Sequence, residues 1–142
     1  MIGYKKCLYF DVDDSKEGYA YFKNALVTLE IPKDSTVVSP CMPWVHASGI
    51  MYKYHDSKKF RCSYAKVLDI VDVNEQTKHV DCAFSIYDFR KRFSYGRSDK
   101  PITVYIKGRK VVADSLDKDE FTECSNGIHF FLTKEEAIEY VI

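Results

Sequence analysis

Apolar and polar side chains alternate through the segment Ala25-Leu26-Val27-Thr28-Leu29-Glu30-Ile31-Pro32. Val27, Leu29 and Ile31 fall on one side of an extended chain, because successive side chains of a β-strand point to opposite faces. Pro32 lacks a backbone N–H and cannot extend a sheet ladder, and the polar residues that follow it are typical of turns. The segment therefore predicts a half-buried strand that ends at a turn.

Four further segments carry short runs of β-branched and aromatic residues, which are typical of strands. They are Gly3–Phe10, Tyr64–Val73, Ile102–Ile106 and Val111–Ala113. The last two flank a short polar segment in which Gly108 can adopt a positive φ, so we expect them to form a hairpin. About five strands result, and antiparallel pairing is their simplest arrangement.

Two segments show helical patterns. From Ile86 to Gly96, apolar residues fall at i, i+3 and i+7, and the glycine stands where a helix commonly ends. Near the C-terminus, Thr133 precedes Glu136 by three residues, which is the pattern of a capping box, and the apolar residues Ala137, Ile138 and Val141 follow. We therefore expect one mid-chain helix and one short C-terminal helix.

These elements predict an α+β fold, a single compact domain built mainly of antiparallel sheet. No repeat or linker composition divides the chain, so residues 1–142 form a single domain in this interpretation. The least regular stretch, Ser39 to Ser57, contains two prolines and a glycine around Trp44. It predicts a long irregular loop around residues 39–57.

Composition limits the classes of partner. The chain has 142 residues, and its 21 basic and 21 acidic residues cancel, so no global field draws it to nucleic acid or a membrane. The N-terminal residues lack the apolar run of an export signal, and no apolar run is long enough to cross a bilayer. Five cysteines without CxxC spacing are expected to be reduced thiols. The expected location is the cytoplasm.

The charges are separated along the chain. From Arg90 to Lys110 there are eight basic residues and one acid, whereas from Val111 to Ile142 there are eight acids and two lysines. Arginines interleaved with aromatic rings in the first segment could bind phosphate and stack on bases. The same cations also suit a solvated helix C-terminus, and the acidic segment could pair with them. Both interpretations are open.

From these patterns we predict a site for an anionic ligand, built from basic and aromatic residues. The residues are Arg61, Tyr64, Lys66, Arg90, Arg92, Tyr95, Arg97 and His129. Arg61 and Lys66 lie five residues apart and would face opposite sides of a strand, so only one of them can line a given pocket.

Other chemistry has less support. The Cys and His residues that could be assembled into a zinc site are Cys41, His46, His55 and Cys62, with spacings of 5, 9 and 7. These spacings match no standard motif, so neither a metal nor a cofactor is expected. Cys124 and His129 could form an activated pair, but a strand histidine between apolar residues is more often structural. No catalytic residue is predicted.

Four stretches of the chain read Gly3-Tyr4-Lys5-Lys6-Cys7, Leu29-Glu30-Ile31-Pro32, Arg61-Cys62-Ser63-Tyr64-Ala65-Lys66-Val67-Leu68-Asp69-Ile70 and Glu123-Cys124-Ser125-Asn126-Gly127-Ile128-His129-Phe130-Phe131, the last leading into Glu135-Glu136-Ala137. Together they resemble a domain of unknown function found in phage and large DNA virus proteins, often C-terminal to pentapeptide repeats. This chain has no such repeats, and its Ser39 to Ser57 segment is longer. The resemblance implies a viral origin and a compact fold, and it implies no reaction.

A weaker resemblance is to ADP-ribosyltransferases, through Gly127-Ile128-His129-Phe130 and Tyr140. Those enzymes have a further strand with a catalytic glutamate, whereas this sequence ends at Ile142.

Taken together, the patterns predict a viral, phage-type binding protein without enzymatic activity that acts on a host component. It would sequester a small anionic ligand such as a nucleotide immune signal. The alternative is a protein–protein interaction module that inhibits a host protein, and the outside alternative is a nucleotide-processing enzyme with an ADP-ribosyltransferase-like fold. No membrane and no sequence-specific nucleic acid are expected as partners, and homo-oligomerisation is left open.

Overall fold

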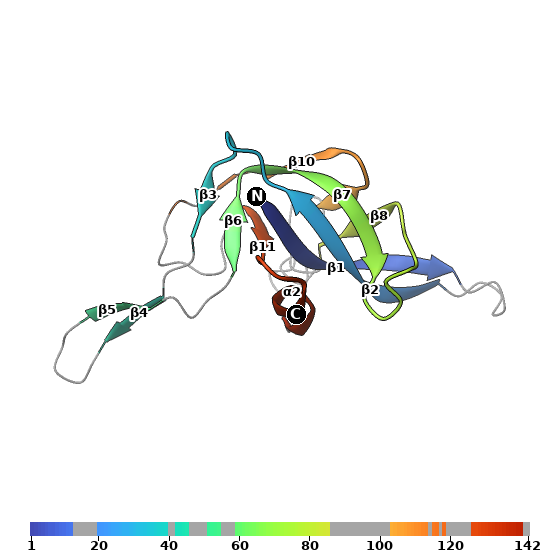
Figure 1. The fold of residues 1–142 in the computed structure, drawn as a ribbon, viewed down its shortest axis with the longest axis horizontal. Coiled ribbons are helices and arrows are strands. Elements are labelled where there is room, and N and C mark those ends of the chain that lie inside the picture. Colours follow the sequence, from blue (N-terminus) through green and yellow to red (C-terminus); the bar gives the residue numbers. More distant parts are fainter. Residues whose placement is uncertain are drawn as a thin grey trace, which may run out of the picture.

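The computed structural model describes residues 1–12, 20–39, 42–45, 51–54, 59–85, 103–113, 115–116, 118 and 126–140, mostly as extended chain (Figure 1). The elements are β1 (Ile2–Val12), β2 (Ala20–Glu30), β3 (Val37–Val38), β4 (Met42–Val45), β5 (Met51–Tyr54), β6 (Phe60–Cys62), β7 (Tyr64–Asp72), β8 (Cys82–Phe84), β9 (Val104–Ile106), β10 (Lys110–Val112), β11 (Ile128–Phe130) and α2 (Lys134–Glu139). The strand pairs are antiparallel, which confirms the predicted α+β fold with mainly antiparallel sheet.

Within the described residues the largest sheet has six strands in the order β10-β7-β2-β1-β8-β9. Its centre is the long hairpin of β1 and β2, in register from Ile2 opposite Glu30 to Val12 opposite Ala20. β2 contains the alternating segment that predicted a strand, and it ends before Pro32 as expected. The chain then turns, and the backbone N–H of Ser35 donates to the Pro32 carbonyl at 3.0 Å.

A short turn joins the two outermost strands of this sheet. β9 lies at one end of the strand order and β10 at the other, yet only residues 107–109 separate them. Three residues span a short distance, so the sheet must curl until its two edges approach each other. Gly108 has the predicted positive φ, 83°, and its N–H donates to the Val67 carbonyl at 2.8 Å.

This topology corrects the hairpin predicted for residues 102–106 and 111–113. The turn is present, but β9 pairs with β8 and β10 pairs with β7. The reason is that each strand completes a different edge of the six-stranded sheet, so the long-range ladders replace the local one. Composition near a turn does not reveal which distant strand is available for pairing.

Two smaller sheets complete the described strands. The first has the order β11-β6-β3, and an isolated bridge between Tyr4 and Phe131 connects it to β1. The second pairs β4 with β5, and it projects away from the other two sheets (Figure 1). The described part of the segment 39–57, predicted as an irregular loop, therefore includes an antiparallel pair of strands.

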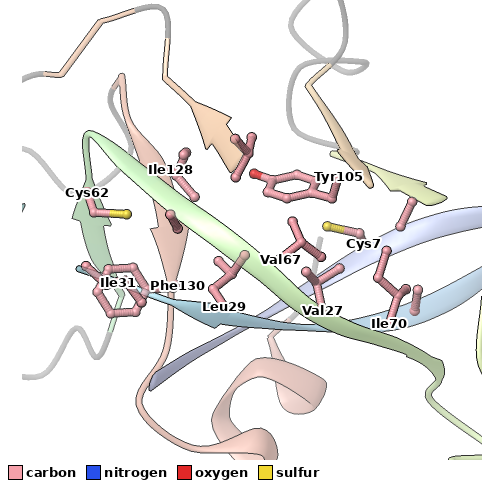
Figure 2. Close-up of a cluster of buried hydrophobic side chains, with 14 of the residues drawn as sticks. Cys7, Val27, Leu29, Ile31, Cys62, Val67, Ile70, Tyr105, Ile128 and Phe130 are labelled. Carbon is pink, nitrogen blue, oxygen red and sulfur yellow. The ribbon is translucent and has the colours of Figure 1, made fainter. Parts of the chain in front are cut away.

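The main core lies between the curled sheet and the three-stranded sheet (Figure 2). Inward positions of β1, β2 and β7 supply small and branched side chains that are fully buried, including Cys7, Val27 and Val67. Tyr9 of β1, Tyr105 of β9 and Phe130 of β11 contribute large aromatic rings to the core. The burial pattern of β7 alternates on either side of Leu68 and Asp69, where a register shift against β2 changes which positions face the core.

The C-terminal helix forms as its sequence predicts. Thr133 is the N-cap of α2, and its hydroxyl oxygen accepts a hydrogen bond from the Glu136 N–H at 3.3 Å. Ala137 is fully buried against Leu26 and Phe131 on the outer side of the six-stranded sheet. The mid-chain helix predicted from Ile86 to Gly96 lies outside the described residues. In the described part of the chain no helix has the length and hydropathy needed to span a bilayer.

Candidate functional site

A buried basic face lies on the three-stranded sheet. β6 is the central strand of that sheet, so its neighbouring side chains point to opposite sides. Phe60 and Cys62 belong to the main core, where the Phe60 ring stacks on Phe130 with ring centroids 5.5 Å apart. Lys59 and Arg61 occupy the alternate positions, and they are only 4% and 1% exposed. Two basic side chains are thus buried on the side away from the core.

His129 joins this face from the adjacent strand. In β11, Ile128 and Phe130 pack in the main core, and His129 between them lies opposite Arg61 in the antiparallel register. His129 is 5% exposed. We call Lys59, Arg61 and His129 the basic face.

Gly127 allows the chain to pass close to Arg61. Its φ of 136° lies in a region that residues with a Cβ rarely adopt. A Cβ at this position would lie 3.2 Å from Arg61 Cβ and 2.8 Å from Leu116 Cδ1. The absence of a side chain at residue 127 therefore shapes the wall of the basic face.

Tyr140 links the basic face to α2. Lys59 Nζ donates to the Tyr140 hydroxyl at 2.7 Å and lies 4.5 Å from the centroid of its ring. The Tyr140 ring also contacts Phe131, with centroids 5.3 Å apart. Lys6 of β1 donates to the carbonyls of Ile138 and Tyr140, at 3.0 and 3.4 Å, and so satisfies acceptors at the C-terminal end of the helix.

Basic groups gathered away from water favour a negative charge beside them. A charged group is costly to bury unless opposite charge or hydrogen-bond acceptors surround it. Attraction to an anion is also stronger there than on the surface, where water and salt screen it. The planar guanidinium of Arg61 matches carboxylate and phosphate oxygens, and His129 adds positive charge when protonated. Such a face is chemically suited to hold an anionic group.

The structure separates Tyr64 and Lys66 from this face. Both lie on β7, at positions that alternate with the buried Ala65 and therefore point to the outside of the six-stranded sheet. Lys66 is exposed, and the Tyr64 ring lies 4.2 Å from Lys110 Nζ. A hydrogen bond with Asp34 raises the pKa of the Tyr64 hydroxyl.

Among the predicted ligand residues, Arg61 and His129 are therefore brought together, whereas the half-buried Tyr64 and the exposed Lys66 lie on the outer side of β7. The other four, Arg90, Arg92, Tyr95 and Arg97, lie outside the described residues. Sequence reasoning missed Lys59 and Tyr140. The signal for Lys59 was its position two residues before Arg61, which places both on one side of an extended chain. Tyr140 carried no such signal, because only the packing of α2 brings it to Lys59.

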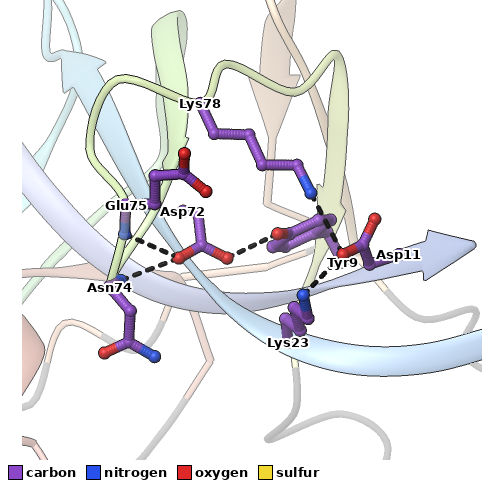
Figure 3. A network of polar contacts seen from close by, with 7 residues as sticks. All are labelled: Tyr9, Asp11, Lys23, Asp72, Asn74, Glu75 and Lys78. Carbon is purple, nitrogen blue, oxygen red and sulfur yellow. Dashed lines mark hydrogen bonds and ion pairs between the residues drawn. The ribbon is translucent and has the colours of Figure 1, made fainter. Parts of the chain in front are cut away.

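A second polar cluster, also missed, lies at the far end of β1 (Figure 3). The buried Asp72 carboxylate accepts hydrogen bonds from the Tyr9 hydroxyl at 2.5 Å and from the backbone N–H groups of Asn74 and Glu75 at 2.8 and 2.9 Å. These bonds tie the end of β7 to β1 and to the turn that follows. An aspartate at an inward position of the strand, after Ala65, Val67 and Ile70, was the available signal.

Asp11 extends this cluster. Its carboxylate forms ion pairs with Lys23 at 2.6 Å and Lys78 at 3.0 Å, and hydrogen bonding to these lysines lowers the pKa of Asp11. Burial raises the pKa of Asp72, but the hydrogen bonds it accepts outweigh burial and hold its pKa below the ordinary value. Burial and the bond to Asp72 raise the pKa of Tyr9. At neutral pH both carboxylates are ionised and the phenol is protonated, so the cluster serves to hold strands together.

Three of the cysteines lie in the described residues. Cys7 and Cys62 are buried and Cys82 is exposed. Burial raises the pKa of the Cys62 thiol to about 11, which leaves it a poor nucleophile at neutral pH. Cys41 and Cys124, with the pairings considered for them, lie outside the described residues.

Comparison with known proteins gives one assignment. No curated protein and no solved structure matches the chain. A family model described as a family of unknown function, DUF5758, matches residues 1–137. That match covers nearly all of the 142 residues, including every residue of the basic face. The chain belongs to DUF5758, a family whose function is unknown.

Proposed function

We propose that this chain is a binding protein without enzymatic activity, which holds a small anionic ligand such as a nucleotide against the basic face. The observation that carries the proposal is the position of Arg61 opposite His129 in the β6–β11 register, with the buried Lys59 on the same side. Three basic side chains at one place in the interior give a local preference for negative charge that a net charge of zero conceals.

Recognition would divide between the three side chains by their chemistry. The Arg61 guanidinium can donate two parallel hydrogen bonds to phosphate oxygens, while Lys59 supplies a compact charge. Lys59 donates to the Tyr140 hydroxyl, so a phosphate must compete with that hydroxyl for Lys59. An ionised acceptor forms the stronger bond, which favours the exchange.

The biological setting belongs to the same proposal. The sequence resemblance to phage and large DNA virus proteins supports a chain that acts in the host cytoplasm and sequesters a nucleotide immune signal. A binding protein suffices for that role, because removing a signal requires affinity and abundance rather than turnover.

The test is a thermal-shift screen of the whole chain against mono-, di- and cyclic nucleotides, followed by calorimetry. A ligand at 100 times its dissociation constant should stabilise the fold by about 2.7 kcal/mol. We expect Arg61→Lys, which keeps the charge but loses the planar fork, to weaken binding by about 1.5–3 kcal/mol. His129→Gln should weaken it also. Lys66→Gln, which removes an exposed charge elsewhere, is the matched control and should bind as the parent does.

Two results would redirect the assignment. If no nucleotide stabilises the chain, the proposal fails and the protein–protein interaction alternative takes its place, for which the exposed rings of Phe10 and Phe22 are the favouring observation. If a nucleotide binds but is recovered chemically altered, the chain is a nucleotide-processing enzyme. Chromatography of the bound ligand after incubation distinguishes the two.

A further inference from the structure

Among the described residues, the outer side of the six-stranded sheet is covered over only part of its width. α2 packs over one part, against Tyr4, Leu26 and Val71. The part formed by β2, β1, β8 and β9 carries apolar side chains at outward positions, where an antiparallel sheet that faces water normally has polar ones. Its main residues, which we call the apolar face, are Phe10, Phe22, Cys82, Phe84, Val104 and Ile106.

The residues of the apolar face lie opposite or next to one another on adjacent strands, so their side chains are in contact. Phe10 lies opposite Phe22, and Phe84 lies opposite Val104. The ring centroids of Phe10 and Phe22 are 4.4 Å apart, and Phe84 is 5.5 and 5.6 Å from them. Cys82 and Ile106, a further opposite pair, extend the face along β8 and β9. The apolar side chains therefore form one patch across four adjacent strands.

The patch is large for a chain of this size. Phe10 is 58% exposed, Phe22 52%, Val104 46% and Ile106 38%. With Cys82 and Phe84 these side chains present about 500 Å² of apolar surface, which is near the upper end of what isolated soluble proteins show. Apolar patches of this size on a protein surface are often functional.

We propose that a second copy of this chain covers the apolar face. Two such patches packed face to face would bury about 1,000 Å² of apolar surface, which reaches the lower limit of specific interfaces before any polar rim is added. A sheet face can pack on a copy of itself, with the strands of the two sheets roughly aligned. The formal net charge of zero adds no repulsion between copies. Area, shape and charge thus all permit a two-fold dimer at this face.

The test is sedimentation velocity of the whole chain over a concentration series. We expect a monomer–dimer equilibrium with a dissociation constant of about micromolar, given an interface at the small end of the specific range. Phe10→Thr and Phe22→Thr, which introduce β-branched side chains suited to a strand, should each weaken dimerisation at least tenfold. Val112→Thr removes an equally exposed apolar group from β10, outside the face, and should leave the equilibrium unchanged.

A measurement on the unaltered chain decides the matter if the variants fail to fold. Cys82 is an exposed thiol on the apolar face, so dimerisation should slow its alkylation as protein concentration rises. A monomer at every concentration would overturn the proposal. So would a dimer in which Cys82 stays fully reactive, because that dimer would use another surface.

Discussion

Replacing Gly3 with alanine should destabilise the fold through a steric clash in the core. Gly3 lies on β1, where the chain passes directly against the rings and branches of the main core. A Cβ there would lie 2.9 Å from Phe130 Cγ and 2.9 Å from Ile31 Cδ1, closer than real Cβ atoms approach other heavy atoms. The Phe130 ring is fully buried and stacks on Phe60, so it cannot move aside without opening other contacts.

The magnitude follows from two opposing effects. Overpacking of a well-packed core costs about 1–3 kcal/mol. Against this, alanine restricts the unfolded chain and returns about 0.4–1 kcal/mol. Because the new Cβ would also clash with Phe130 Cδ2, the cost lies at the upper end of that range, and we expect a net loss of about 2 kcal/mol for Gly3→Ala. Gly108→Ala is the matched control, because a Cβ there meets nothing within 4 Å and only the positive φ of 83° opposes it. Its cost should be about 1 kcal/mol.

Urea unfolding of the two variants and of the double variant Gly3→Ala/Phe130→Leu measures these free energies. A smaller side chain at position 130 gives the new methyl group room, so the double variant should be more stable than the sum of the single effects predicts. If Gly3→Ala is as stable as the parent, the close packing of β1 against β11 is refuted. If Gly3→Ala is destabilised but the double variant loses the sum of the two single losses in unfolding free energy, the clash is not with Phe130.

Three further predictions concern titration, thiol reactivity and capping. The pKa of Asp72 is lower in the folded chain than its unfolded value of about 3.9, so ionised Asp72 stabilises the fold fully above pH 3.9, and this stabilisation is lost as pH falls through the folded pKa. Asp72→Asn should therefore make the free energy of unfolding less dependent on pH in the acid range. In the native chain at a concentration low enough to keep it monomeric, Cys82 should react with iodoacetamide while Cys62 reacts only on unfolding, as peptide mass analysis will show. Labelling of Cys62 in the folded state would contradict its burial. Thr133→Ala should cost about 1 kcal/mol in urea unfolding while Thr133→Ser retains most of the cap, and equal stability of both would show that α2 does not depend on it.

Local patterns in the sequence were enough to locate β2, β7 and α2. In each case the decisive information lies within a few residues: alternation for the strands, and a Thr133–Glu136 capping box for the helix. Local patterns do not reveal which strand pairs with which. β9 and β10 flank a turn and still pair with β8 and β7, because closure of the curled sheet depends on strands that lie far away along the chain.

The candidate site shows the same division. Arg61 and His129 could each be predicted as candidate ligand residues, because each interrupts an apolar run. That they lie opposite each other depends on the register of β6 and β11, which the sequence does not reveal. Lys59 shares the face through alternation and could have been found. Tyr140 could not, because it reaches Lys59 only after α2 docks on the six-stranded sheet.

The basic face and the apolar face lie far apart along β1. The basic face buries charge, whereas the apolar face exposes rings. The Tyr4–Phe131 bridge joins β1 to the chain just after His129, and Phe10 lies six residues further along an extended strand, which is about 20 Å. Substitutions that far apart with no shared neighbours should act additively. Arg61→Lys should therefore change ligand binding without changing dimerisation, and Phe10→Thr the reverse. Coupling between the two would mean that the curled sheet itself changes shape when either surface is occupied.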